Sequence, residues 1–81
     1  MATIKSPMPG IFYRRPSPGA DEFSQPGDAV TAGQTIGLVE VMKNFAELKT
    51  KDAGTFKHFL LEDGDEVSVG QDVAIVEQTS G

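Results

Sequence analysis

The chain has no cysteine, no tryptophan and a single histidine, His58, among its 81 residues. Without cysteine it can form neither a disulfide nor a thiolate metal site, and one histidine is too few for a histidine-rich metal site. No apolar run approaches the ~20 residues that cross a bilayer as a helix. Residues 1–5 lack the apolar stretch of a signal peptide. These absences exclude zinc fingers and His–Cys catalytic pairs, and we expect a cytoplasmic protein.

Positive charge is also scarce. Seven lysines and arginines stand against twelve aspartates and glutamates, which gives a formal net charge of −5. Nucleic acid requires a basic face, and an anionic membrane repels an acidic chain. We therefore expect neither nucleic acid nor membrane as a partner. The acidity is equally compatible with simple solubility and with a charge-matched protein partner.

A chain of 81 residues is long enough for one domain, so we treat residues 1–81 as a single domain. Nine glycines and five prolines divide it into short segments. Such frequent punctuation favours an all-β fold over a helical one. We expect strands at residues 3–5, 10–15, 28–31, 35–41, 45–50, 54–62, 65–68 and 72–77.

The chain contains an internal repeat. Residues 27–40 (GDAVTAGQTIGLVE) match residues 64–77 (GDEVSVGQDVAIVE) without a gap, and seven of the fourteen positions are identical. In each copy a Gly-Asp turn leads into a short alternating strand, and a Gly-Gln turn leads into a second one. Two similar four-strand halves in one small domain predict a barrel or sandwich with a pseudo-two-fold axis.

The first half carries a loop that the second half lacks. Residues 10–12 match residues 54–56 with an offset of 44, whereas the repeat downstream has an offset of 37. Seven extra residues must therefore lie between residues 13 and 26. Pro16 and Pro18 in that stretch cannot continue a paired strand. We expect a protruding loop there.

Residues 39–49 are ambiguous when they are read alone. Their propensities and the spacing of their apolar side chains would suit a helix. The repeat favours strands instead, because Val39 and Glu40 match the end of the second β pattern at Val76 and Glu77. The chain must then turn around residues 42–44. No glycine marks this turn, so its ordinary residues are expected to be strained, and backbone strain gathers at functional sites.

The residues at this turn carry a resemblance. Glu40-Val41-Met42-Lys43 resembles the Glu-Ala-Met-Lys-Met attachment motif of biotinyl domains. Residues 6–10 (SPMPG) resemble the Ser-Pro-Met-x-Gly opening of the biotin carboxyl carrier family of acetyl-CoA carboxylase. Residues 12–18 (FYRRPSP) are similar to the segment that leads into the "thumb" loop of that family. The resemblance covers residues 4–77.

The resemblance implies a flattened eight-stranded barrel of two four-stranded sheets, with Lys43 in the turn between the fourth and fifth strands. It implies that Lys43 bears biotin in an amide bond and that a thumb at residues 15–23 lies over the prosthetic group. The sequence departs from the family motif at Val41, which replaces alanine, and at Asn44, which replaces methionine. Both changes bear on how a standard biotin ligase recognises the turn.

Several residues near this turn allow two interpretations. Met42 is either turn filler or, as its soft unbranched side chain favours, part of a recognition surface. Glu40 has Glu77 as its repeat partner, so it is as readily structural as part of the recognition motif. Arg14 and Arg15 are more naturally surface charges than ligands of carboxybiotin. His58 is expected to point outward. The residues expected in the core or the barrel wall are Phe12, Phe56, Phe59, Val67, Val73 and Ile75.

The resemblance implies a non-catalytic carrier. Biotin on Lys43 would move a carboxyl group between a biotin carboxylase and a carboxyltransferase, in acetyl-CoA carboxylase or a related enzyme, after attachment by a biotin protein ligase. One alternative is a lipoyl-type carrier, whose motif resembles Asp-Lys-Ala or Asp-Lys-Ser; Met42 before Lys43 disfavours it. The other alternative is an unmodified β-barrel that serves as an assembly module.

Overall fold

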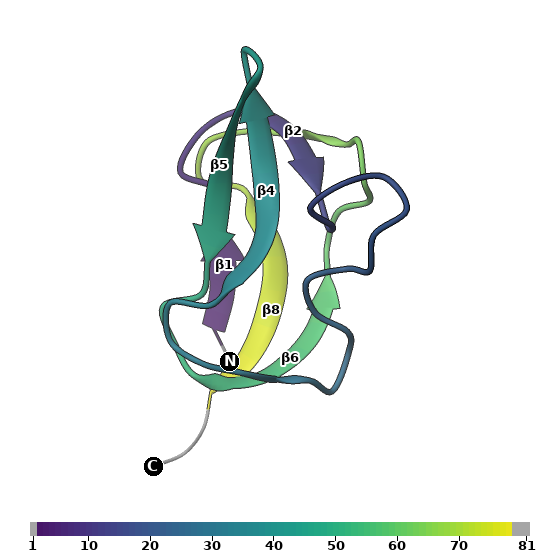
Figure 1. Cartoon of the computed structure of the whole chain (residues 1–81). Coiled ribbons are helices and arrows are strands. Elements are labelled where there is room, and N and C mark those ends of the chain that lie inside the picture. The colour runs from purple at the N-terminus through teal and green to yellow at the C-terminus, as the bar shows by residue number, and fades with distance from the viewer. Residues whose placement is uncertain (1, 79–81) are drawn as a thin grey trace.

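The computed structural model describes residues 2–78, which form eight strands and no helix (Figure 1). The strands are β1 (Ala2–Lys5), β2 (Gly10–Tyr13), β3 (Ala29–Val30), β4 (Thr35–Val41), β5 (Asn44–Lys49), β6 (Gly54–Phe59), β7 (Glu66–Val67) and β8 (Asp72–Gln78). The predicted all-β class is confirmed, and the helical alternative for residues 39–49 is wrong. No helix long and apolar enough to span a membrane occurs among residues 2–78.

The eight strands form two antiparallel sheets of four strands, in the orders β1-β8-β6-β3 and β5-β4-β2-β7. The predicted closure into a barrel is not found, because no ladder joins the two sheets within residues 2–78. Closure would need hydrogen bonds across both seams between the sheets. β3 and β7 have only two residues each, and β1 and β5 stay unpaired at the other seam. The molecule is therefore a sandwich of two sheets.

The internal repeat is visible in the hydrogen bonds. Exchanging β1–β4 for β5–β8 converts the strand order of one sheet into that of the other. The amide of Gly27 donates to the Phe56 carbonyl over 2.8 Å, and the amide of Gly64 donates to the Phe12 carbonyl over 2.7 Å. In both halves a glutamine side chain accepts from the amide three residues before it. The predicted pseudo-two-fold relation therefore holds down to individual bonds.

The core lies between the sheets, where Phe12 and Phe56 of the two halves are fully buried. Each such large apolar side chain contributes about 1.5–3 kcal/mol through its removal from water. The other buried apolar residues are Ile4, Val30, Ile36, Val39, Leu48, Val67, Val73, Ala74 and Val76. Phe59 and Ile75, predicted as core or barrel wall, are half-buried, and Phe59 packs against the core. His58 is exposed as expected.

Two strands end earlier than the sequence predicts. β2 ends at Tyr13 rather than at residue 15, because the Arg14 amide turns away and donates to the side chain of Asp63. β6 ends at Phe59 rather than at residue 62, where the chain enters the turn that leads to β7. Both departures occur where the connection between β2 and β3, residues 14–28, meets the turn between β6 and β7.

Candidate functional site

The hairpin of β4 and β5 is the most extensive strand pair in its sheet, with a register that runs from Thr35 opposite Lys49 to Val41 opposite Asn44. Met42 and Lys43 alone form the turn, so Asn44 belongs to β5 and not to the turn as predicted. The hairpin extends beyond the body of both sheets (Figure 1). The two turn residues therefore stand at one end of the molecule.

Both turn residues adopt the left-handed backbone conformation, with φ of 51° at Met42 and 71° at Lys43. Positive φ at both central positions is the type I′ geometry, which matches the twist of the flanking strands and normally selects Asn-Gly. Methionine and lysine adopt it at a cost of about 1–3 kcal/mol each. The strain predicted for this glycine-free turn is thus confirmed.

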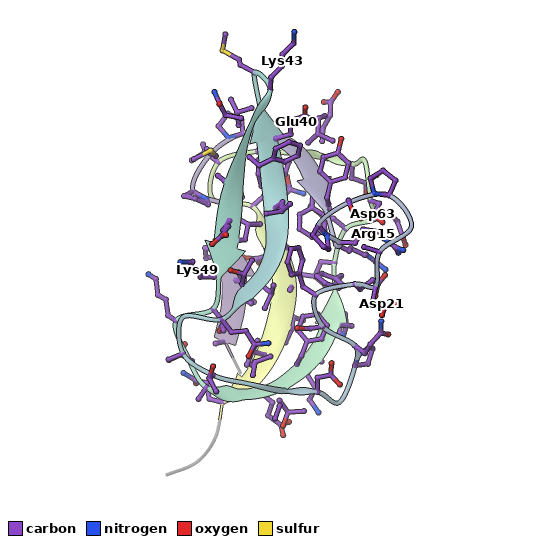
Figure 2. The ribbon with its side chains drawn as sticks, viewed as in Figure 1. Arg15, Asp21, Glu40, Lys43, Lys49 and Asp63 are labelled. Atoms are coloured by element: carbon purple, nitrogen blue, oxygen red, sulfur yellow. The ribbon has the colours of Figure 1, made fainter. Side chains whose placement is uncertain are left out.

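The side chains at the hairpin tip face solvent. Met42 is 89% exposed, an unusual position for a large apolar side chain. Lys43 points away from the domain (Figure 2) and enters none of the ion pairs found among residues 2–78. The hairpin therefore presents a primary amine beside an apolar contact, with no neighbouring side chain in the way.

Glu40 lies below the tip and has a structural partner that the sequence did not reveal. The hydroxyl of Tyr13 on β2 donates to Glu40 Oε1 over 3.1 Å. The hydrogen bond to Glu40 raises the pKa of Tyr13, and partial burial and the negative charges of Glu40 and Asp63 add to the shift. The ring of Tyr13 also packs against Phe45, with centroids 6.3 Å apart. Glu40 thus ties the hairpin to the neighbouring strand.

Tyr13 could have been found only from the register. It lies opposite Leu38 in the ladder of β2 and β4, so Glu40 is its diagonal neighbour on the same face. The segment of residues 12–18 that resembles the family contains this tyrosine, but residue spacing along the chain does not reveal a cross-strand contact. The pairing is a consequence of tertiary structure.

Val41 and Asn44, the two departures from the family motif, face each other at the last pair of the hairpin. Val41 is half-buried and packs against the core, close to Gly10 on β2. A Cβ on Gly10 would clash with the Glu40 carbonyl oxygen, so only glycine allows this approach. The absence of a side chain at residue 10 makes room for valine at position 41. Asn44 is exposed, and nothing in the structure explains its replacement of methionine.

Loop 14–28 stands beside the hairpin and encloses a groove of about 500 Å³ with it. We call this cavity the loop groove. Its lining residues are Tyr13, Arg15, Pro16, Ser17, Pro18, Leu38, Phe45 and Asp63. Most of this wall is aromatic, aliphatic or proline, and Phe45 remains 58% exposed within it. The loop groove can therefore hold an apolar, ring-shaped group near the hairpin.

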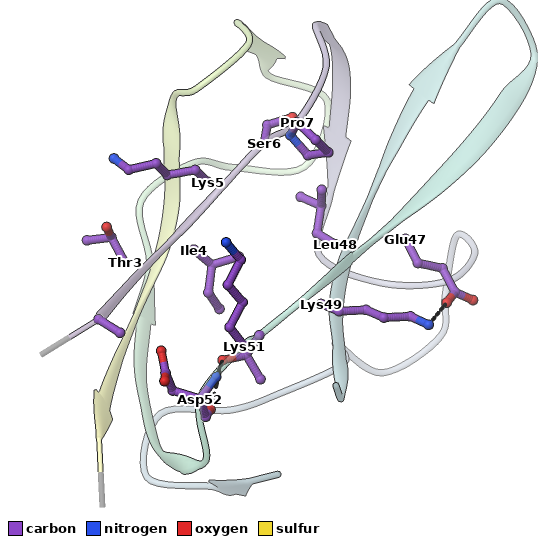
Figure 3. Close-up of a pocket in the computed structure, with 12 residues that line it drawn as sticks. Thr3, Ile4, Lys5, Ser6, Pro7, Glu47, Leu48, Lys49, Lys51 and Asp52 are labelled. Carbon is purple, nitrogen blue, oxygen red and sulfur yellow. Dashed lines mark hydrogen bonds and ion pairs between the residues drawn. The ribbon is translucent and has the colours of Figure 1, made fainter. Parts of the chain in front are cut away.

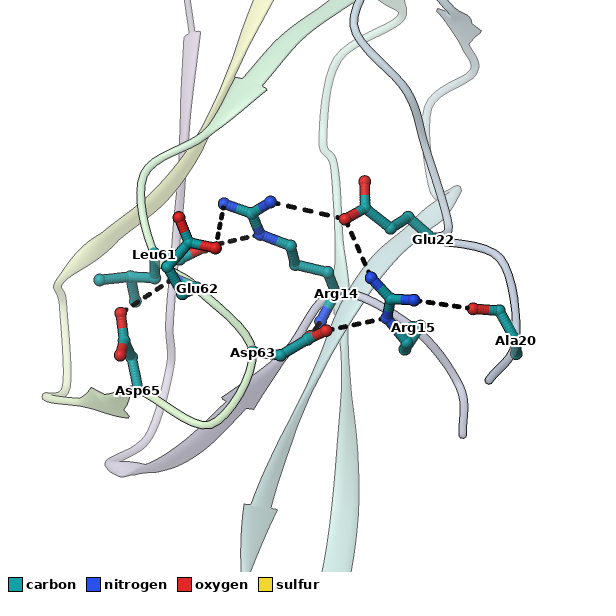
Figure 4. Close-up of polar contacts among 8 residues, drawn as sticks. All are labelled: Arg14, Arg15, Ala20, Glu22, Leu61, Glu62, Asp63 and Asp65. Atoms are coloured by element: carbon teal, nitrogen blue, oxygen red, sulfur yellow. Dashed lines mark hydrogen bonds and ion pairs between the residues drawn. The ribbon is translucent and has the colours of Figure 1, made fainter. Parts of the chain in front are cut away.

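Arg15 holds the loop in this position. Its Nε donates to Asp63 Oδ2 over 2.8 Å, and its two terminal nitrogens reach the Ala20 carbonyl at 3.1 Å and Glu22 at 3.3 Å (Figure 4). Only 34% of the Arg15 side chain is exposed. One guanidinium thus joins the start and the middle of the loop to the turn between β6 and β7.

Arg14 reinforces the same attachment from the other side. Its Nε donates to the Leu61 carbonyl over 2.8 Å, its terminal nitrogens pair with Glu22 and Glu62, and its guanidinium stacks 4.9 Å from the centre of the Phe59 ring. With 20% exposure, Arg14 is far from a freely solvated charge. The prediction that the two arginines are surface charges rather than ligands of carboxybiotin stays a prediction. The structure adds that both are half-buried and bind partners from chain segments that are distant in sequence.

The fold and the hairpin define a small domain that exposes one lysine on a fixed turn, and comparison with known proteins gives the family. The model of the family described as "Biotin-requiring enzyme" matches residues 2–77. The chain belongs to this family.

Curated relatives and a solved structure agree with the family match. The chain is 41% identical over 73 residues to biotin carboxyl carrier protein of acetyl-CoA carboxylase 2, chloroplastic, from Arabidopsis thaliana, covering 90% of this chain and 29% of that protein. It is 43% identical over 76 residues to the biotin carboxyl carrier protein of acetyl-CoA carboxylase from Pyropia yezoensis, covering 94% and 48%. The chain spans about half the length of these relatives or less.

The crystal structure of the Kluyveromyces lactis urea carboxylase superposes with a TM-score of 0.79 at 25% identity. The match covers 94% of this chain and 6% of that one. The same two-sheet domain is thus present as a small part of a much larger carboxylase chain.

Proposed function

We propose that Lys43 is the attachment site of biotin and that the domain is a mobile carrier of the carboxyl group in a biotin-dependent carboxylase, most simply an acetyl-CoA carboxylase. The observation that supports this best is the strained Met42-Lys43 turn, which presents an unpaired amine at one end of a domain of this family. When bound, biotin accepts a carboxyl group at one active site and releases it at another. The domain supplies presentation and no catalytic step.

The residues present suit the prosthetic group. The amine of Lys43 is free to form an amide bond, and Met42 offers an adaptable apolar contact to a ligase. Glu40 has its carboxylate engaged by Tyr13, so it stabilises the hairpin on which Lys43 stands. Val41 anchors the same hairpin in the core. These side chains present the lysine in one defined place.

The partners that follow are a biotin protein ligase, a biotin carboxylase and a carboxyltransferase. A protruding hairpin can enter the cleft of each of these proteins in turn, because the rest of the domain lies below it. Tethering near two active sites raises the effective concentration of the cofactor, to about the millimolar scale for short flexible links.

We also propose that loop 14–28 acts as a thumb for the group on Lys43, as the resemblance implies for residues 15–23. Phe45 in the loop groove is two residues from Lys43, about 7 Å along the strand. A long flexible arm on Lys43 can fold back over that distance. The apolar wall beside it then shelters a ring from water between transfers.

The attachment site is tested by incubating the chain with a biotin protein ligase, ATP and biotin and then measuring its intact mass. Wild type should gain one biotinyl group. Lys43→Arg keeps the charge and should gain none, whereas Lys51→Arg, a control at another exposed lysine, should behave as wild type. Biotin on the Lys43→Arg variant would place the acceptor at another lysine. A lipoyl mass after expression with both ligases would assign the domain to the other carrier class.

A further inference from the structure

A second groove lies at the other side of the hairpin, where the sandwich is open. Its volume is about 460 Å³, and its walls are residues 2–7, which contain β1, and residues 47–52 at the end of β5 (Figure 3). We call it the edge groove. It shares no lining residue with the loop groove. The proposed carrier function does not use it.

Both walls of the edge groove are free strand edges. Within residues 2–78, β1 and β5 are the outermost strands of their sheets, and each pairs with a single neighbour, β8 or β4. Half of the backbone N–H and C=O groups of an outermost strand point away from its neighbour. An extended segment can satisfy these groups by adding itself as a further strand.

The edge groove carries a small excess of positive charge although the chain is acidic. Three of the seven cationic side chains line it, Lys5, Lys49 and Lys51, against two carboxylates, Glu47 and Asp52. Outward and inward side chains alternate along β5, so Glu47 and Lys49 are exposed while Leu48 is buried. Lys49 therefore stands in the row that an added strand would face with every second side chain, while Lys51 follows the end of β5 and Lys5 lies on β1.

The existing partners of these lysines are weak competitors. Lys49 pairs with Glu47 at 3.5 Å while both side chains are more than half exposed, and Lys5 pairs with Asp72 at 59% and 43% exposure. Exposed pairs of this kind contribute about 0–1 kcal/mol. Lys51 enters no ion pair found among residues 2–78. All three ammonium groups can thus turn towards an incoming anion at little cost.

We propose that the edge groove is a docking site for an extended, carboxylate-rich segment of a partner protein. The segment adds as a strand to the free edge of β5, and its carboxylates lie beside Lys49, with Lys51 and Lys5 also lining the groove. Backbone hydrogen bonds supply the affinity, and the lysines select acidic side chains. The site lies away from the tip (Figure 2), so an occupied edge groove leaves Lys43 accessible. The carrier can then stay docked to its partner while the group on Lys43 enters an active site.

A second copy of the chain is a poorer occupant. The outward row of β5 holds Glu47 and Lys49, so two β5 edges that pair with each other bring both like and opposite charges together. A net charge of −5 on each copy adds long-range repulsion. The repulsion between two acidic copies is therefore the argument against self-association.

The probe is a blocked hexapeptide of alternating glutamate and valine, titrated into the ¹⁵N-labelled chain and followed by amide chemical shifts and hydrogen exchange. Its control is the same peptide with glutamine in place of glutamate. We expect the shifts and the new exchange protection to concentrate at residues 45–51 and 2–6. The glutamine peptide should bind at least tenfold more weakly, and salt should weaken the glutamate peptide.

Variants of exposed lysines complete the test. Lys51→Gln should weaken the glutamate peptide about threefold and Lys49→Gln/Lys51→Gln about tenfold, as expected for the loss of one and two exposed charge pairs. Lys57→Gln on β6 removes the same charge elsewhere and should leave binding unchanged. Biotinylation of Lys43 should stay at the wild-type rate in all three. Equal binding of both peptides, binding of neither, or shifts at β5 that depend on protein concentration alone would overturn the proposal.

Discussion

Tyr13 is a built-in reporter of the contact that supports the hairpin. It is the only tyrosine in a chain without tryptophan, so absorbance of the phenolate follows this one residue. Its pKa is raised, above all by the hydrogen bond to Glu40. The folded state thus favours the protonated phenol. This stabilising effect is complete below about pH 10, the pKa of an unfolded tyrosine, and is lost as pH rises through the raised pKa.

We predict that Glu40→Gln lowers the pKa of Tyr13 towards its ordinary value, because an amide can accept the hydrogen bond but carries no charge. Phenolate absorbance against pH measures the midpoint directly. Glu47→Gln, which removes a carboxylate of the same sheet that is not among the causes of the shift, should leave the midpoint in place. An unchanged midpoint in Glu40→Gln would mean that the Tyr13–Glu40 contact does not persist in solution.

The left-handed conformation of Met42 makes the tip less stable than its geometry allows. Asparagine tolerates positive φ better than methionine does. We therefore predict that Met42→Asn raises the free energy of unfolding by about 0.5–1 kcal/mol, measured by urea denaturation. Biotinylation of Lys43 should become slower, because the exposed thioether is lost. If Met42→Asn is less stable than wild type, the predicted relief of strain is contradicted. If Lys43 is biotinylated at the wild-type rate in this variant, the predicted role of Met42 in ligase recognition is contradicted.

At the scale of elements, the Asp63 carboxylate makes two of the contacts that hold loop 14–28 in place. Asp63 lies in the turn between β6 and β7, far from the loop in sequence. Its carboxylate accepts hydrogen bonds from the Arg14 amide and from the Arg15 guanidinium. We predict that Asp63→Asn loosens the loop and speeds amide exchange at residues 14–23, with a loss of about 1 kcal/mol in stability. The strands should keep their protection, since the core does not include the loop.

Asp21→Asn is the matched control for this loop. Asp21 lies in the same segment, is exposed and enters none of the hydrogen bonds or ion pairs described for the loop. It removes the same charge without removing a contact. If both variants speed exchange equally, net charge rather than the Asp63 contact holds the loop.

The arrangement of the elements was largely predictable, because the match of residues 27–40 to residues 64–77, at an offset of 37, shows which strands correspond. The repeat placed the β4–β5 hairpin and the extra loop, and the absence of glycine at residues 42–44 indicated that the turn is strained. The ends of β2 and β6 were not predictable, because they depend on contacts of Arg14 with Asp63 and Leu61 across the fold. The open seam was missed for a similar reason, since a repeat specifies equivalent strands but not whether edges meet.

At the scale of the whole molecule, the candidate site was predicted only as far as local sequence allows. Lys43, Met42 and Val41 follow from a contiguous motif, whereas Tyr13 and Phe45 join the site through strand register. The net charge led us to expect that the chain binds neither nucleic acid nor membranes, and this stays a prediction. The cytoplasmic location also stays a prediction. It did not reveal that three lysines gather at one seam, because net charge carries no information on position.

The pseudo-two-fold relation has a consequence for which end of the domain can be attached to something else. A perfect copy would have a second hairpin where β8 ends and β1 begins, and there Ala2 instead lies opposite Val76. This position is at the far end of the molecule from Lys43 (Figure 1). The two ends of the domain therefore differ, with the β4–β5 turn at one end and the unconnected ends of β8 and β1 at the other. Anything attached near Ala2 or Val76, whether a label, a surface or another polypeptide, leaves the β4–β5 turn facing outward.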